Sequence, residues 1–191
     1  MIDLQKEHAQ SESEDQETAI IGIDHLGINV PDIDSATAFL QLAFGAKVIY
    51  ESYSKQQVPL DLTGIEETLN VAMGTKIYAC RMIKIGRGPT IELFEVHVDG
   101  QREAIKSSDL GIQHFCFYTD NMISSIKRFV SAGGKILSDP NPILFPLEKG
   151  DRNFFCYGLL PWGTSIEFIT YPDGMPYEAN TRLRRWKGGK T

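Results

Sequence analysis

The sequence predicts an α+β fold of two tandem βαβββ modules, and three observations support this prediction. The segment Gly22-Ile23-Asp24-His25 recurs 89 residues later as Gly111-Ile112-Gln113-His114. Further along, Ile91-Glu92-Leu93-Phe94 is echoed by Ile166-Glu167-Phe168-Ile169. Around both echoes the chain shows the same order of a strand, a helix and three more strands. Self-similarity of this kind indicates a duplicated module.

In the first copy, residues 21–30 are β-branched and alternate in polarity, which predicts a strand that Pro31 ends. Asp32 or Asp34 is placed to cap a following helix, and Gly45 is placed to end it. The apolar face predicted for this helix consists of Ile33, Ala36, Leu40 and Phe44. Three more strands are predicted at residues 47–53, 76–85 and 90–98.

The second copy repeats this order. Residues 112–119 predict a strand, Asn121 is placed to cap the next helix, and Gly133-Gly134 ends it. The apolar face predicted for this helix consists of Met122, Ile126, Phe129 and Val130. The strands that follow are predicted at residues 135–137, 153–160 and 165–171. The first copy is 14 residues longer between its histidine and its glutamate, and we expect the extra residues between positions 54 and 75.

Charge and polarity predict the module boundaries and the character of the two ends. Residues 1–19 are acidic and lack periodicity, so we expect a disordered leader. The first module is predicted over residues 20–110 and the second over residues 111–172. Residues 173–191 carry five basic and two acidic side chains and are predicted to form a solvated C-terminal tail.

Composition excludes several classes of protein. The net charge is −6 and the two modules are mildly acidic, so nucleic acid is not an expected partner. No apolar run approaches the roughly 18 residues of a membrane span. The three cysteines, Cys80, Cys116 and Cys156, lack paired spacing. We therefore expect a cytoplasmic protein with reduced thiols and no membrane partner.

Four ionisable side chains occupy equivalent positions in otherwise apolar strands: His25, Glu92, His114 and Glu167. A carboxylate in a buried strand needs a partner, because an unpaired buried charge is costly. Two imidazoles and two carboxylates could satisfy one another around a divalent ion, and this donor set suits Zn, Ni, Co, Mn or Fe better than Ca or Mg. Each residue taken singly could instead be a core histidine or a surface glutamate. The equivalence of all four favours a metal site.

Alternation along the strands predicts which side chains share a face with these four. Cys116 and Tyr118 lie on the face of the second histidine, and Phe94 and Ile169 form apolar walls beside the glutamates. Glu95 is expected on the opposite face of its strand.

The segments around these four residues resemble the metal-bearing strands of the vicinal oxygen chelate superfamily, which includes glyoxalase I, methylmalonyl-CoA epimerase, extradiol dioxygenases and bleomycin-resistance proteins. The resemblance covers residues 20–172. It implies a U-shaped mixed sheet whose concave face holds one divalent metal ion. It also implies a small-molecule substrate that chelates the ion through neighbouring oxygens. Related proteins build the site within one chain or across two, so a homodimer is a further expectation.

A ligand set of His, Glu, His and Glu is that of glyoxalase I and is close to that of the epimerases. The resemblance therefore implies a lyase or isomerase that abstracts a proton next to a carbonyl, with Glu167 as the base and Glu92 as its counterpart. The implied substrate contacts are Asn29, Phe94, Cys116, Tyr118 and Ile169. Asn29 and Val96 stand where glutathione-dependent enzymes carry an arginine and an amide, which argues against glutathione.

Two other functions stay open on the same scaffold. An iron(II) extradiol dioxygenase would use His25, His114 and Glu167 as its three ligands and would not need Glu92. A metal-free binding or resistance protein would need none of the four.

Overall fold

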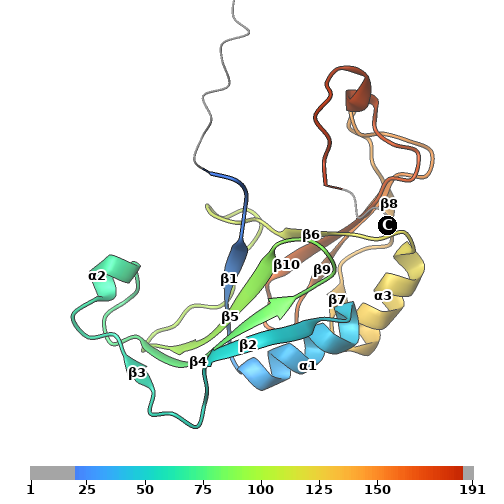
Figure 1. Cartoon of the computed structure of the whole chain (residues 1–191). Coiled ribbons are helices and arrows are strands. Elements are labelled where there is room, and N and C mark those ends of the chain that lie inside the picture. The colour runs from blue at the N-terminus through green and yellow to red at the C-terminus, as the bar shows by residue number, and fades with distance from the viewer. Residues whose placement is uncertain (1–19, 187–191) are drawn as a thin grey trace, which may run out of the picture.

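The computed structural model describes residues 20–186, and the predicted leader lies outside this range (Figure 1). The first module consists of β1 (His25–Val30), α1 (Ile33–Phe44), β2 (Lys47–Tyr53), β3 (Leu60–Asp61), α2 (Glu66–Leu69), β4 (Lys76–Lys84) and β5 (Thr90–His97). The second module consists of β6 (Phe115–Tyr118), α3 (Met122–Ser131), β7 (Lys135–Ile136), β8 (Asn141–Pro142), β9 (Phe154–Leu159) and β10 (Ser165–Thr170). A 3₁₀ turn, η1 (Pro176–Ala179), follows.

The strands form two mixed sheets with the same topology. The first sheet has the order β1-β5-β4-β2, and the second has the order β6-β10-β9-β7. In each sheet the first strand of the module runs parallel to the last, and the other pairs are antiparallel. The short strands β3 and β8 add to β4 and β9. The predicted duplication of a βαβββ module is therefore confirmed.

Helix α1 begins and ends where the sequence predicts. The Asp32 carboxylate accepts a hydrogen bond from the backbone N–H of Ser35 at 2.7 Å, and Gly45 ends the helix with φ of 67°. Glu95, on the helix-facing side of β5, is 6% exposed and accepts a hydrogen bond from the backbone N–H of Ile33 at 2.8 Å. This carboxylate fixes the N-terminus of α1 against the sheet.

An aromatic core joins the two modules through their helices. The Phe44 ring stacks on Phe117 at a centroid separation of 4.4 Å, and Phe39 packs edge-on against Phe129 at 5.7 Å. Phe129 is fully buried, and α1 and α3 pack against each other. Along β5, buried residues that face this core alternate with half-exposed ones. Each sheet therefore turns one face to the helices and leaves the other face open.

Two strands begin several residues later than predicted. Strand β1 begins at His25 rather than at residue 21, and β6 begins at Phe115 rather than at residue 112. The ladder of β1 stops at Asp24, whose carbonyl accepts a hydrogen bond from the N–H of Thr90 at 3.0 Å. Residues 21–23 precede the first residue of β5 in register, so β5 offers them no residue to pair with.

The sequence predicts Val130 in the apolar face of α3, but Val130 is 51% exposed. Met122 and Phe129 already align on the core side of the helix, and Val130 lies one position further round. The extra residues of the first copy fall between positions 54 and 75 as expected, and they contain β3 and α2. None of the helices in the described part of the chain is long and apolar enough to cross a membrane.

Replacing Gly134 by alanine should destabilise the fold, because the new Cβ would overlap the buried Phe129 ring. Overpacking of this kind costs about 1–3 kcal/mol in the free energy of unfolding, which urea denaturation measures. Gly88→Ala is the matched control, since no atom lies within 4 Å of its Cβ position. Equal stability of the two variants would contradict this packing.

Candidate active site

The first His–Glu pair lies on the neighbouring strands β1 and β5. His25 Nε2 faces Glu92 Oε2 at 3.4 Å, and His25 Nδ1 lies 2.8 Å from the Asp24 carboxylate. In the parallel register Gly27 stands opposite Glu92, and the Phe94 ring packs over Gly27 on the same face. The side chains of His25 and Glu92 are 41% and 22% exposed. The pair is therefore reachable from outside.

The second His–Glu pair has the same geometry. His114 immediately precedes β6, and its Nε2 lies 3.1 Å from Oε2 of Glu167 on β10. The other ring nitrogen, Nδ1, lies 3.0 Å from the side-chain oxygen of Gln113. Tyr157 of β9 packs edge-on against the imidazole, at a centroid separation of 5.1 Å. The two modules thus share the arrangement of this His–Glu pair as well as the fold.

Asp24 and Gln113 occupy the same place in the repeated tetrapeptide, and each holds Nδ1 of the histidine that follows it. This leaves Nε2 as the nitrogen that faces the glutamate. Metal-binding histidines commonly have their second ring nitrogen held in this way by an oxygen. Sequence reasoning misses these two positioning residues, although a signal exists: both copies carry a side-chain oxygen directly before the histidine.

A cysteine accompanies each glutamate. Cys80 Sγ donates a hydrogen bond to Glu92 Oε1 at 3.3 Å, and burial, reinforced by Glu92, raises the pKa of this thiol to about 12. Cys116 is partly exposed, yet desolvation and the charge of Glu167 raise its pKa well above the usual range. Both groups are therefore neutral thiols at pH 7, able to donate a hydrogen bond to the carboxylate beside them.

The two pairs lie in different sheets and do not form one site within the chain. Among residues 20–186, no group of three or more His, Cys, Asp or Glu is close enough to hold a metal ion. Strands β1 and β6 are both edge strands, and neither pairs on its outer side with another described strand. The chain therefore presents two half-sites, each with one imidazole nitrogen and one carboxylate at a free sheet edge.

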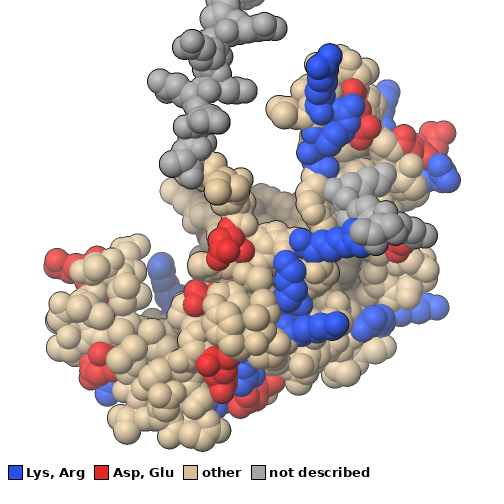
Figure 2. Space-filling view, in the orientation of Figure 1, with Lys and Arg blue, Asp and Glu red and all other residues tan. Residues whose placement is uncertain are grey.

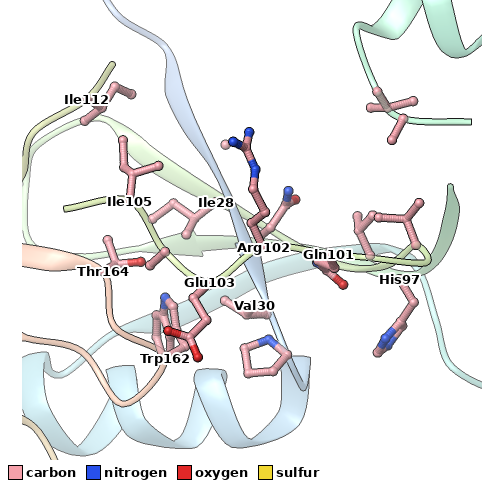
Figure 3. Close-up of a pocket in the computed structure, with 18 of the residues that line it drawn as sticks. Ile28, Val30, His97, Gln101, Arg102, Glu103, Ile105, Ile112, Trp162 and Thr164 are labelled. Atoms are coloured by element: carbon pink, nitrogen blue, oxygen red, sulfur yellow. The ribbon is translucent and has the colours of Figure 1, made fainter. Parts of the chain in front are cut away.

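A pocket of about 750 Å³ lies between the modules, beside β1 and the start of β6 (Figure 3). Asn29 and His114 both line it, together with the connection over residues 98–105. Trp162 forms part of its wall, and the buried Nε1 of Trp162 has no hydrogen-bond partner among the described residues. Asn29 is thus placed in a cavity that also reaches the second histidine.

The other predicted substrate contacts differ in how much of each side chain is exposed. Phe94 lies half-buried beside Gly27, on the open face of the first sheet. Tyr118 follows Cys116 on the open face of the second sheet, and its ring contacts that of Tyr171 at 4.8 Å. Ile169 is 4% exposed, because it packs with Ile143, Tyr171 and Met175, so it offers a substrate little surface.

Residues 24–146 match the family described as the Glyoxalase/Bleomycin resistance protein/Dioxygenase superfamily. The chain belongs to this superfamily. The resemblance to this superfamily that the sequence shows is therefore confirmed. A 2-epi-5-epi-valiolone epimerase from Actinomyces sp is 26% identical to the chain over 176 residues, which cover 87% of the chain and 88% of that protein.

Solved structures of superfamily members share the fold at low sequence identity. A glyoxalase family protein from Bacillus cereus aligns with a TM-score of 0.60 at 13% identity, over 81% of this chain and 97% of that one. A mutant of the fosfomycin resistance protein FosX from Listeria monocytogenes, complexed with Mn(II) and 1S,2S-dihydroxypropylphosphonic acid, aligns with a TM-score of 0.51 at 18% identity. That alignment covers 85% of this chain and 98% of FosX.

In the metal-free protein, the pKa of His25 should lie above its ordinary value of 6.5, mainly because Asp24 accepts a hydrogen bond from the ring. Asp24→Asn should lower this pKa, whereas Glu67→Gln, an exposed change on α2, should not. Titration of the histidine Hε1 signals by NMR measures both effects. A His25 pKa that is indifferent to Asp24→Asn would contradict the positioning role of Asp24.

Proposed function

We propose that the protein is a divalent-metal-dependent epimerase or isomerase that moves a proton next to a carbonyl of a small, oxygen-chelating substrate. The observation that carries this proposal is the repeated His–Glu pair, in which both histidines are held through Nδ1 and face a carboxylate through Nε2. The epimerase relative at 26% identity supports this class of reaction. The three free thiols suit a reducing compartment, which we take to be the cytoplasm.

The donor atoms fit a divalent transition metal. Two imidazole nitrogens and two carboxylates form a set that Zn, Ni, Co, Mn or Fe accepts, and coordination positions beyond these four would be open to substrate oxygens. FosX, which shares the fold, is described with Mn(II). We therefore propose that His25, Glu92, His114 and Glu167 together hold one ion.

A second copy of the chain would complete the site. The half-sites stand at the free edges of β1 and β6, and the helix-to-helix core keeps them in separate sheets within one chain. In a two-fold dimer, β1 of one copy can face β6 of the other, and symmetry then repeats the contact. Each homodimer would contain two four-ligand sites, with each copy giving one His–Glu pair to each site.

The chemistry follows from the carboxylates on either side of the substrate. When bound, the ion would polarise the substrate carbonyl and so acidify the adjacent C–H bond. Glu167 would accept this proton and later release it to solvent, and Glu92, after taking up a proton from solvent, would deliver it to the opposite face of the resulting enolate, which inverts the carbon. The Cys80 thiol holds the Glu92 carboxylate in place through its hydrogen bond.

The presence of Glu92 beside His25 favours this reaction over the alternatives. An iron(II) dioxygenase with two histidines and one carboxylate would leave Glu92 without a role, although Glu92 faces His25 as Glu167 faces His114. A metal-free binding protein would need neither pair, nor the side chains that hold Nδ1 of each histidine.

After reconstitution with each candidate metal, wild-type protein should retain about one ion per chain by elemental mass spectrometry. His114→Ala and Glu167→Ala should each lose the ion while keeping the fold, because each removes one donor from a four-donor site. His97→Ala is the matched control, since this exposed histidine lies on the same strand as Glu92 without facing it. Full metal retention in both variants would exclude the four-ligand site.

A complementation experiment tests whether the site is shared between copies. The double variants His25→Ala/Glu92→Ala and His114→Ala/Glu167→Ala should bind no metal separately. Co-refolded in equal amounts, they should recover about a quarter of the wild-type metal, because half of the dimers are mixed and each mixed dimer has one intact site. If the site formed within one chain, the mixture would recover none.

A further inference from the structure

A folded arm covers one end of the second sheet, where the sequence predicts a solvated tail. It consists of residues 143–153 and 173–186, and it extends beyond β8 and β10 in Figure 1. Asn153, fully buried, holds its two segments together: Nδ2 donates hydrogen bonds to the carbonyls of Glu148 and Gly174, at 2.9 and 2.7 Å. The arm is therefore part of the folded body.

The arm closes one end of the open face that carries the second half-site. Glu167 and Ile169 of β10 and Tyr171 just beyond it are spaced two residues apart, so their side chains lie on the same face of the chain. Ile169 and Tyr171 are 4% and 3% exposed, because Ile143 and Met175 of the arm pack over them. A substrate at Glu167 that extends along β10 would therefore meet the arm.

Arg185 stands at this end, held by several contacts. Its backbone N–H donates to the hydroxyl of Tyr177 at 2.8 Å, and Nη1 donates to Glu148 Oε2 at 3.2 Å. The guanidinium lies 5.6 Å from the centre of the Tyr171 ring, and the Tyr171 hydroxyl donates to the carbonyl of Trp186 at 2.8 Å. Figure 2 shows Lys and Arg side chains gathered on the arm at the upper right.

One edge of the Arg185 guanidinium is free to bind a ligand. Nη1 is engaged by Glu148 and by Met175 Sδ, but Nε and Nη2 make no hydrogen bond with any residue between positions 20 and 186. The side chain is 40% exposed. Parallel N–H groups on such an edge bind a carboxylate or a phosphate in a bidentate manner, which an ammonium group cannot do.

The charge of Arg185 acts on the same face as the half-site. The Arg185 guanidinium lies against the Tyr171 ring, and Tyr171 lies on the same face of the chain as Glu167. Arg185 opposes the rise that burial causes in the pKa of Tyr171. Tyr171 lies four positions after Glu167, a distance of roughly 13 Å in an extended chain. The Arg185 guanidinium, which lies beside Tyr171, is therefore separated from the proposed base Glu167 by about the length of a small molecule.

We propose that Arg185 binds an anionic group, a carboxylate or a phosphate, at the far end of the substrate whose carbonyl reacts at the His–Glu site. This inference rests on the proposed function and narrows it to substrates with a terminal anion. Glu148 orients the guanidinium from the side of Nη1 and leaves the other edge to the ligand. Arg185 is then a specificity-determining residue supplied by the arm.

The test uses full-length, Mn(II)-loaded protein and three chelating probes that differ only in the end of the tail. These are octanohydroxamic acid, its analogue with a terminal carboxylate, and its analogue with a terminal phosphonate. By calorimetry, one of the anionic tails should bind about tenfold tighter than the methyl tail in the wild type. The stronger of the two identifies the anion. Arg185→Met should abolish this preference, and Arg185→Lys should restore only part of it.

Two control variants separate recognition from support of the arm. Glu148→Gln removes the charge of the ion pair but keeps a side-chain oxygen that can accept the hydrogen bond from Nη1 of Arg185, so the preference for an anionic tail should persist. Arg184→Met removes a neighbouring arginine that pairs with Glu178, and it should change nothing. Equal binding of all three tails by wild type, or a preference that survives Arg185→Met, would contradict the proposed role of Arg185 without contradicting the metal site. Failure of every probe to bind overturns the metal site as well.

Discussion

The aromatic contact between α1 and the second module determines how the two sheets, and with them the two His–Glu pairs, are placed. Phe44 stacks on Phe117, and Phe39 packs edge-on against Phe129. Each such pair contributes about 0.5–1.5 kcal/mol beyond its burial of apolar surface. Because the modules meet through their helices, the faces with the His–Glu pairs are left open. The packing that holds the modules together therefore keeps the two half-sites apart within one chain.

Each half-site is organised by contacts close to it, so it does not depend on the other. Asp24 and Gln113 hold the histidines that follow them, and thiols neighbour the glutamates. Such preorganisation lowers the cost of assembling a site from two copies. The arm breaks the symmetry of the duplication, because its two segments lie between β8 and β9 and after β10, in and beyond the second module only. Arg185 therefore gives one end of the site a charge that the repeat itself does not contain.

The features that the sequence predicts correctly are those with local causes. Asp32 caps α1 and Asn121 caps α3 through hydrogen bonds to residues three positions further on, so their effect can be read from the chain alone. The start of β1 depends on where its partner strand begins, and residues 21–23, which look like a strand in the sequence, precede the first residue of β5 in register. The contact of Arg185 with Glu148 spans 37 positions and depends on the folded arm. The division of the four ligands into two pairs depends on which faces of the modules meet, which periodicity does not encode.

Anomalous diffraction from crystals of the zinc-loaded protein would show whether two copies of the chain share each metal ion. We expect about one peak per chain, at ordinary ligand distances of about 2.0–2.2 Å from His25 and Glu92 of one copy and from His114 and Glu167 of a second. A peak bound by the two pairs of a single chain, or by one pair alone, would contradict this expectation.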